Sequence, residues 1–282
     1  MGNPLAVCVA FGGTYRQREC VTTPIPKVLI LSSTVASSRV GASAASFCLQ
    51  RLGIETVVLP TTLMGRHPGW GPPGGGATPP EMLQDMWGGV AAQNIKFDAV
   101  LTGYMGDVAH IDLGVEIIRL IKSENPKAII AVDPVMGDHG QLYIPESRAM
   151  AILERLLPLA DFITPNLWEF VFISSQTSDL PDRLITSVLD GENIGAVWQD
   201  SNKRHQVSHA KFKSVPHGGG DSLAALFLGR RLLGEAPDIA LAKSVASVFE
   251  IMRAADALDA GELPLVRMQA FINDPIALEL HK

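Results

Sequence analysis

Three glycines followed by an aspartate stand at the start of an apolar, alanine-rich segment. The stretch reads SVPHGGGDSLAALFLG over residues 214–229, and its glycines are Gly218, Gly219 and Gly220. Glycines ahead of a helix let backbone N–H groups face an anion, and the helix dipole adds partial positive charge there. Asp221 could take a proton from a substrate hydroxyl while those N–H groups stabilise a phosphoryl group in transfer. In the alternative interpretation, Asp221 only caps the helix.

A second acidic motif is AVDPVMGD, residues 131–138. Asp133 stands at the expected end of a strand and could reach a metal ion or a metal-bound water, because hard cations prefer oxygen ligands. The motif therefore suits a magnesium–nucleotide site. The alternative is that Asp133 only opens an Asp-Pro turn.

A third motif is TPNLWE, residues 164–169. Pro165 and Asn166 lie at a strand exit and could open a helix, which places Glu169 on its first turn. Glu169 could help to hold metal-bound water or phosphate, or it could simply favour the helix dipole. The Walker sequence G-x-x-x-x-G-K-[ST] is absent, and no G-x-G-x-x-G follows the first strand, which disfavours a dinucleotide-binding fold.

Strand and helix patterns alternate along the chain. Apolar runs predict strands over residues 27–33, 54–60, 97–104, 127–133, 161–166 and 193–199. Helices are predicted over 42–52, 78–92, 111–124, 145–160, from 167 onward, and over 221–233 with further helices to about 258. Thr78 and Glu81 have the spacing of a capping box at the start of the second helix. A polar segment after residue 199 is a candidate for a further strand.

This alternation predicts an α/β fold with a mainly parallel sheet covered by helices on both faces. In such sheets ligands bind beyond the carboxyl ends of the strands. Chemically distinctive residues should therefore follow the strands directly. The residues that do so are Ser33, Thr61, Thr62, Gly103, Tyr104, Asp133 and Asn166.

Composition narrows the class of protein. Of 282 residues 47% are hydrophobic and 18% charged, which allows a large core, and the net charge of −6 argues against a nucleic-acid surface. No apolar run is long enough to span a membrane. The three cysteines are not at metal-ligand spacing and indicate reduced thiols in a cytoplasmic protein. We expect residues 1–26 to form a tail that need not be ordered and lies outside a single domain of residues 27–282.

Taken in order, the motifs resemble those of pyridoxal kinases, in the ribokinase-like superfamily. The resemblance extends from about residue 27 to about residue 258. Its pieces are LSSTVASSRVGASAASFCLQRLG, TTLMGRHPGWG, LTGYMG, DPVMGD, TPNLWE, GGGDSLAALFLG and SVFEIM. The resemblance implies a three-layer ribokinase-like fold. It also implies phosphorylation of the 5′-hydroxyl of pyridoxal, pyridoxine or pyridoxamine with ATP and Mg²⁺ by a homodimer, with a monovalent cation as a further possible requirement.

The resemblance also implies a role for each matching residue. Asp221 would be the base, and the three glycines before it would form the anion hole and meet the nucleotide. Asp133 and Glu169 would serve the magnesium–ATP end, with Thr164 and Asn166 near the nucleotide. The residues near the vitamer would be Ser33, Thr62, His67, Tyr104, Tyr143 and Asp221.

This sequence departs from the family pattern in three places. Gly219 replaces the threonine of the usual Gly-Thr-Gly-Asp, which removes a hydroxyl and leaves a looser loop. Trp198, in VWQDSN, is bulky for a nucleotide edge, and the segment 199–216 is short. Residues 69–77 are a candidate lid or only a flexible connection. Two other functions therefore stay open: kinase activity on a hydroxymethylpyrimidine, and vitamer binding with weak catalysis.

Overall fold

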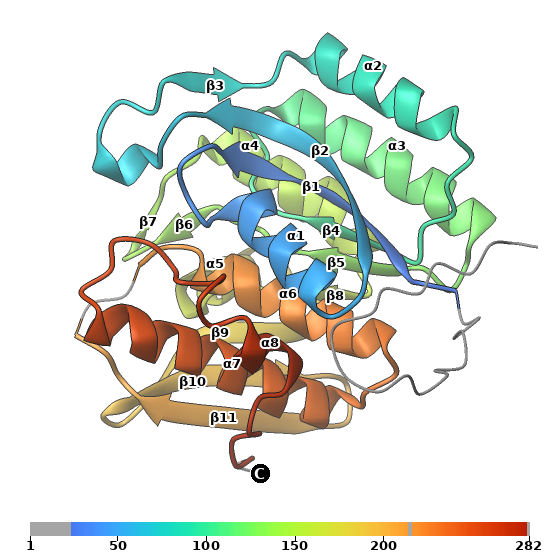
Figure 1. Ribbon diagram of the computed structural model, residues 1–282. Helices are drawn as coiled ribbons and strands as arrows, with labels where there is room; N and C mark the ends of the chain where they lie inside the picture. Colours follow the sequence, from blue (N-terminus) through green and yellow to red (C-terminus); the bar gives the residue numbers. More distant parts are fainter. Residues whose placement is uncertain (1–23, 214–215, 281–282) are drawn as a thin grey trace, which may run out of the picture.

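The computed structural model describes residues 24–213 and 216–280. Its centre is a nine-stranded sheet in the order β11-β10-β9-β8-β5-β4-β1-β2-β3 (Figure 1). The strands are β1 (Lys27–Val35), β2 (Glu55–Met64), β3 (Gly75–Ala77), β4 (Ala99–Thr102), β5 (Ile129–Val132), β8 (Phe162–Ile163), β9 (Asp182–Asp190), β10 (Asn193–Gln199) and β11 (Arg204–Ala210). A separate hairpin pairs β6 (Gly137–Asp138) with β7 (Gln141–Leu142).

The centre of the sheet is parallel, as the sequence predicts. β1 pairs in parallel with β2 and β4, and parallel pairing continues through β5, β8 and β9. Antiparallel strands close both edges: β10 and β11 beyond β9, and β3 beyond β2. The carboxyl ends of β1, β4, β5 and β8 therefore meet at one edge of the sheet, where ligands bind in folds of this kind.

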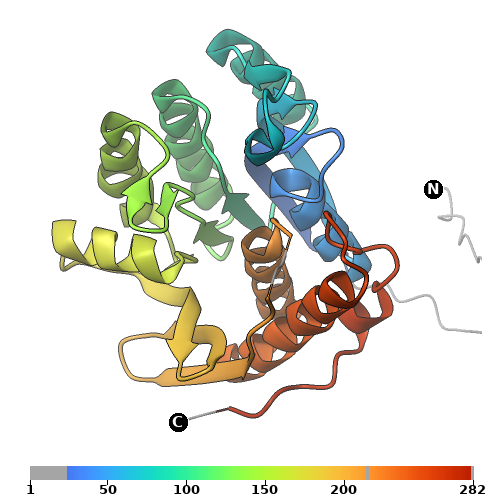
Figure 2. The same ribbon diagram turned by 90° about the vertical axis from the view of Figure 1, so that its left-hand side faces the viewer.

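Helices cover both faces of the sheet, which gives three layers (Figure 2). On one face lie α1 (Gly41–Arg51), α6 (Gly219–Leu232), α7 (Pro237–Ala257) and the short α8 (Ala270–Asn273). On the other lie α2 (Pro80–Ala91), α3 (Val108–Glu124), α4 (Glu146–Ala151) and α5 (Leu167–Gln176). A π turn (Ile152–Leu156) and a 3-10 turn (Leu157–Leu159) continue α4.

Alternation along β1 explains why both faces need a cover. Val28 and Ile30 point into the core beneath α1 and α6, whereas Leu29 and Leu31 point into the core beneath α3. All four side chains are fully buried. A central strand with four successive apolar residues cannot leave either face in water. The same argument accounts for the alanine-rich α6, which is buried on nearly all sides between α1, α7 and the sheet.

Two strands extend further than their apolar runs predict. Ser33 lies inside β1, and Thr61 and Thr62 lie inside β2, so the expectation that these residues follow the strands is wrong. The pairing of Ser33 with Thr62 resumes after a bulge between Ser32 and Ser33. Antiparallel pairing with β3 also supports the end of β2, at Thr62 opposite Ala77. Long-range pairing therefore carries polar residues into the sheet beyond the apolar segments.

The sequence patterns also missed β9 and misassigned one helix cap. β9 has polar ends, is only partly buried and holds Ser187 at φ 58°, so it lacks a clear strand pattern. The capping box at Thr78 does not form, because the Thr78 hydroxyl donates to the Pro60 carbonyl and the N-cap of α2 is Pro79. The predicted strand after residue 199 is confirmed as β11.

None of the helices in the described ranges is long and apolar enough to cross a bilayer. Cys48 is a free, buried thiol on α1. Burial raises its pKa to about 12, so the thiol stays protonated and packs as a small apolar group.

His110 gives the fold a testable dependence on pH. Its ring is fully buried on α3, and Nε2 donates to the Thr78 carbonyl at 2.8 Å. Burial lowers the pKa of His110, and the hydrogen bond only partly offsets that effect. The unfolded chain therefore takes up the proton first as the pH falls, so the free energy of unfolding should drop below about pH 6.5, with a slope of up to ~1.4 kcal/mol per pH unit for this proton.

The measurement is urea unfolding at pH 7.5 and 5.5 for the wild type and for His110→Gln, which keeps a donor but does not titrate. The variant should lose less stability between the two pH values than the wild type. Equal losses in both proteins would contradict the assignment.

Candidate active site

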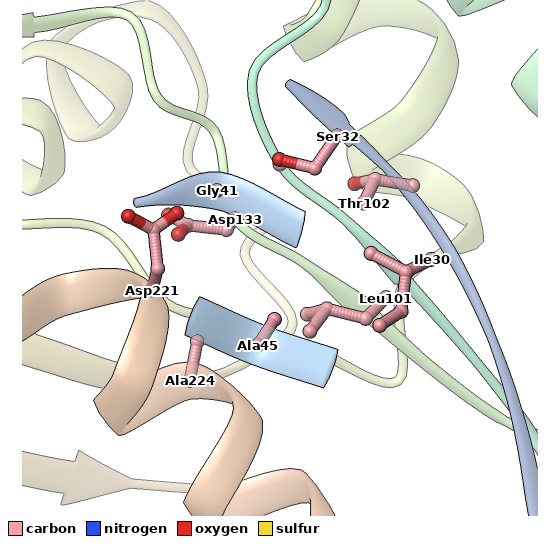
Figure 3. Close-up of a pocket in the computed structure, with 10 residues that line it drawn as sticks. Ile30, Ser32, Gly41, Ala45, Leu101, Thr102, Asp133, Asp221 and Ala224 are labelled. Atoms are coloured by element: carbon pink, nitrogen blue, oxygen red, sulfur yellow. The ribbon is translucent and has the colours of Figure 1, made fainter. Parts of the chain in front are cut away.

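A small cavity lies at the carboxyl end of the central strands (Figure 3). Its walls come from β1, β4, the start of α1, the residue after β5, and the start of α6. The lining residues are Ile30, Ser32, Gly41, Ala45, Leu101, Thr102, Gly103, Asp133, Asp221 and Ala224. The carboxylates of Asp133 and Asp221 point toward the same end of this cavity in Figure 3. Two acids from segments far apart in the sequence therefore face one space.

Asp221 lies in the first turn of α6, at the cavity. Burial raises the pKa of its carboxyl group, and backbone N–H groups of Gly41 and Asp221 together with the nearby His217 partly offset the rise. A raised pKa makes a carboxylate a stronger base, provided that a substrate hydroxyl comes within hydrogen-bond reach. The position beside a helix N-terminus suits the reaction, because the helix dipole stabilises the negative charge of the phosphoryl group during its transfer.

Gly218 is fixed by its conformation and by its neighbour. It is the N-cap of α6 with φ 98° and ψ 0°, a left-handed conformation that glycine adopts without strain. A Cβ at this position would lie 2.0 Å from the Arg39 carbonyl oxygen. A Cβ at Gly220 would meet nothing within 4 Å. In the described part of the chain, the N–H groups of Gly219 and Gly220 have no acceptor. An anion hole needs N–H groups that are unpaired in this way.

Met252 on α7 packs against Gly219. A Cβ added to Gly219 would lie 2.2 Å from the Cε atom of Met252. The methionine therefore occupies the space that a larger residue at 219 would need. Gly219 also begins α6 as part of its first turn, so it is held in a helix and does not lie in a loose loop.

Restoring a threonine at this position should therefore destabilise the protein unless Met252 is shortened. We expect Gly219→Thr to cost about 1 kcal/mol of unfolding free energy, at the low end for overpacking because methionine can move. The double variant Gly219→Thr/Met252→Ala should be more stable than the sum of its single variants predicts. Chemical unfolding in a double-mutant cycle measures the coupling, and strict additivity would refute the contact.

Glu169 joins α5 to the β6–β7 hairpin. Asn166 and Glu169 form a capping box, with each side chain accepting from the other's backbone N–H at 2.8 and 2.9 Å. The second oxygen of Glu169 accepts from the N–H groups of Met136 at 2.7 Å and Gly137 at 3.3 Å. Asn166 also donates to the Gly137 carbonyl at 2.8 Å. Burial raises the pKa of Glu169 to about 7, and these backbone hydrogen bonds oppose the rise.

Asp133 follows β5, as predicted. Unlike Glu169, it does not take part in a helix capping box. Burial raises its pKa well above the usual range, the charges of Glu169 and Asp221 raise it further, and the Thr164 side chain opposes them. Among the described residues no cluster of three or more His, Cys, Asp or Glu could enclose a metal ion. Asp133 is a residue here that could hold a magnesium ion, which commonly binds through one or two carboxylates together with waters and phosphate oxygens.

The other residues predicted near the vitamer lie late in β1 and β2 or in loops, and none is among the residues that line this cavity. Ser33 and Thr62 are buried, and the Thr62 hydroxyl has no hydrogen-bond partner among the described residues. Gly41 lets α1 approach, because a Cβ there would lie 2.4 Å from both the carbonyl and the hydroxyl oxygen of Ser33. Tyr143 is 54% exposed, and desolvation followed by the charges of Glu169, Asp133, Asp221 and Asp138 raises the pKa of its phenol.

Sequence reasoning missed two residues beside these. Arg148 on α4 donates to the Tyr104 hydroxyl at 3.3 Å and to the Met105 carbonyl at 3.2 Å, and so orients Tyr104. His217 stacks on His67 with ring centroids 4.2 Å apart. Arg148 falls within a pattern of an ordinary amphipathic helix, and nothing local marks its partner. His217 directly precedes the glycines, a position that could have drawn attention to it.

Trp198 lies elsewhere than expected. It is 3% exposed and packs between Phe162 and Phe227, with centroids 5.9 and 4.9 Å away. The expectation that this tryptophan stands at a nucleotide edge is therefore wrong. Its role is to fill the core between β8, β10 and α6.

The three-layer fold with two acids at the carboxyl edge of its sheet is the arrangement that the resemblance to kinases of the ribokinase-like class implies. Within that class, residues 75–266 match the phosphomethylpyrimidine kinase family model, so the chain belongs to this family. The chain is 30% identical over 274 residues to the pyridoxal kinase PdxY of Leifsonia xyli, covering 88% of this chain and 96% of that protein. It is 31% identical over 273 residues to PdxY of Rubrobacter xylanophilus, covering 88% and 94%.

Solved structures agree with this fold. The pyridoxal kinase of Leishmania donovani, in complex with ADP and pyridoxine, superposes with a TM-score of 0.83 at 23% identity, over 91% of this chain and 99% of that one. A phosphomethylpyrimidine kinase homologue from Bacteroides thetaiotaomicron gives 0.84 at 20% identity, over 92% and 99%. These comparisons confirm the resemblance to pyridoxal kinases and the three-layer fold.

Proposed function

We propose that this protein transfers the γ-phosphoryl group of ATP to the 5′-hydroxyl of pyridoxal, and to pyridoxine or pyridoxamine, in vitamin B6 salvage. The observation that carries the proposal is Asp221 at the tip of α6, in the cavity that it shares with Asp133. The pyridoxal kinases among the relatives supply the choice of acceptor.

The proposed reaction needs few groups from the protein. Asp221 accepts the proton of the 5′-hydroxyl as that oxygen forms a bond to the γ-phosphorus. The bond from this phosphorus to the β,γ-bridging oxygen breaks, and ADP leaves. The N–H groups of Gly218, Gly219 and Gly220 stabilise the charge of the phosphoryl group during transfer. When bound, Mg²⁺ neutralises phosphate charge, and Asp133 is the residue that would hold it.

The proposed metal site rests on uncompensated negative charge. Burial is the main cause of the raised pKa of Asp133, and the charges of Glu169 and Asp221 raise it further. Burial likewise raises the pKa of Tyr143 most, and the charges of Glu169, Asp133, Asp221 and Asp138 add to it. A cation would relieve this repulsion. Glu169 would contribute mainly by holding the hairpin and the start of α5, since both its oxygens already accept backbone hydrogen bonds. Thr164 and Asn166 would stand near the nucleotide.

The test is ATP-dependent formation of pyridoxal 5′-phosphate from pyridoxal, followed by absorbance, with and without Mg²⁺. Turnover that needs both ATP and Mg²⁺ supports the proposal. Calorimetry separates a weak catalyst from a binding protein: pyridoxal binding without binding of magnesium–ATP would favour the latter and overturn the kinase proposal.

A second candidate is kinase activity on a hydroxymethylpyrimidine. It is favoured by the family model over residues 75–266, which is that of phosphomethylpyrimidine kinases. A competition panel of B6 vitamers and hydroxymethylpyrimidine decides between the two. A higher kcat/KM for the pyrimidine would overturn the assignment of Ser33 and Thr62 to the pyridine ring.

Assembly and organisation follow from the resemblance alone. We propose a cytoplasmic homodimer whose residues 27–282 form one kinase domain, with a monovalent cation as an activator. The predicted tail concerns mainly residues 1–23, which lie outside the described residues. Light scattering at several concentrations measures the dimer, and turnover in potassium, sodium or tetramethylammonium salts measures the ion requirement.

A further inference from the structure

The loop between β2 and β3 is joined to the start of α6 by a pair of histidines. His67 and His217 stack with ring centroids 4.2 Å apart and planes 20° from parallel. Trp70 adds a third ring, 5.8 Å from His67 and tilted by 59°. This close, nearly parallel stack joins a residue predicted near the vitamer to the residue that precedes the glycines. It therefore bridges the acceptor side and the phosphoryl side of the site.

The His67 ring is held in one orientation by its own loop. Its Nδ1 accepts from the Gly69 N–H at 3.1 Å, which leaves the proton of the neutral ring on Nε2. Burial and the neighbouring His217 lower the pKa of His67, with Glu262 opposing them, and these effects favour the neutral ring. A neutral ring stacks without charge repulsion from its partner.

Within residues 24–213 and 216–280, the other hydrogen bonds of this loop either stay inside it or lie at its base. Gly65 and Arg66 donate to Pro72, Pro73 and Gly74 within the loop. At the base, Ser37 donates to the Gly65 carbonyl. Among the described residues, the tip at residues 67–71 makes no hydrogen bond to the body of the molecule, and the ring of His217 stacks on it from the start of α6.

His217 itself stands on a fixed backbone. The next residue, Gly218, lies so close to the Arg39 carbonyl that a Cβ would approach it to 2.0 Å. Leu263 also touches this position, with Cδ1 at 3.1 Å from the same point. The side chain of His217 therefore extends from an anchored turn and can serve as a support for the loop.

We infer that His217 is a positioning residue, which holds His67 and its loop over the acceptor side of the site by aromatic stacking. This inference rests on the proposed function for its kinetic consequence only. Loss of the His217 ring should have two consequences that can be measured independently. One is weaker use of the acceptor, seen in KM, and the other is easier proteolysis of the exposed loop.

The kinetic experiment compares His217→Ala with His217→Phe, which keeps a stacking ring. The alanine variant should raise KM for pyridoxal about threefold to tenfold, the range expected for one aromatic pair, and leave KM for ATP within about twofold. The phenylalanine variant should stay near the wild type. Because His217 acts through His67, the double variant His67→Ala/His217→Ala should be no worse than His67→Ala alone. His205→Ala, on the edge strand β11, is the control for loss of a histidine elsewhere.

The second readout is tryptic cleavage after Arg66, an exposed residue at the start of the tip. Mass spectrometry follows the fragment that begins at His67. Cleavage should be faster in His217→Ala than in the wild type, and unchanged in His217→Phe and His205→Ala.

Unchanged KM and unchanged cleavage in His217→Ala would overturn the inference. So would a phenylalanine variant that behaves like the alanine variant, because the imidazole and not the stack would then matter. A fall in kcat alone would place His217 at the phosphoryl group and would equally overturn it. If the wild type phosphorylates no vitamer, the proposed function fails, whereas the expected order of cleavage rates still supports the stack.

Discussion

Asp221→Asn should lower kcat for pyridoxal phosphorylation by about 10²- to 10⁴-fold, the usual contribution of a general base. The carboxylate lies in the cavity at the N-terminus of α6, where an amide of the same shape can donate a hydrogen bond but cannot accept the proton of the 5′-hydroxyl. Binding should survive because the shape of the site is kept. Steady-state turnover and calorimetric titration with pyridoxal measure the two quantities separately.

The stability of this variant is the matching control. Burial raises the pKa of Asp221 above its usual value of 3.8, so the folded protein disfavours the charged form. The wild type therefore loses stability as the pH rises from about 3.8 to the folded-state pKa, and asparagine removes that loss. Asp221→Asn should consequently unfold at the same or a higher urea concentration at pH 7. An asparagine variant with full turnover would rule out Asp221 as the base.

Gly218→Ala should disable the enzyme through its backbone. The position has φ 98°, and the new Cβ would fall 2.0 Å from the Arg39 carbonyl oxygen, which belongs to the backbone and cannot rotate away. Backbone strain alone costs about 1 to 3 kcal/mol, and the turn must move to relieve the clash. Because the N–H groups of the anion hole move with the turn, kcat should fall by roughly 10²-fold or more.

Gly234→Ala provides a matched control at the opposite end of the same helix. Gly234 has φ 86°, but a Cβ there would meet nothing within 4 Å. Gly234→Ala should lower the free energy of unfolding measured in urea, because of backbone strain, and should keep the wild-type kcat. If Gly218→Ala and Gly234→Ala behaved alike in both measurements, the close approach to Arg39 would have no role in the site.

The local sequence pattern was sufficient to predict the strands of the central sheet, because these strands are buried on both faces and are therefore apolar runs. It failed where stability comes from distant partners. The end of β2 is supported by β3, β9 is supported by β8 and β10, and Thr78 bonds to Pro60 and not to its own helix. A helix-start pattern cannot reveal that the preferred partner of a threonine lies on another strand.

The site shows the same division. Asp133 and Asp221 could be named from their positions after a strand and after the glycines, and the structure places both at one cavity. The sequence could not show that both oxygens of Glu169 accept backbone hydrogen bonds, since two of the donors, Met136 and Gly137, lie directly before β6 and at its start. Nor could it show that Trp198 lies in the core, because an alternating strand pattern does not say which face is covered by α6.

The covering of one sheet face by α6 and α7 has a consequence for biosynthesis. Val28 and Ile30 are made early and α1 follows them closely, but α6 and α7, which complete the cover of this face, begin only at Gly219 and Pro237. At ribosomal rates of about 5 to 20 residues per second, the part of this apolar face that α6 and α7 cover stays open in the nascent chain for roughly 10 to 40 s. Chaperone engagement of the emerging polypeptide should therefore persist until α7 has left the exit tunnel.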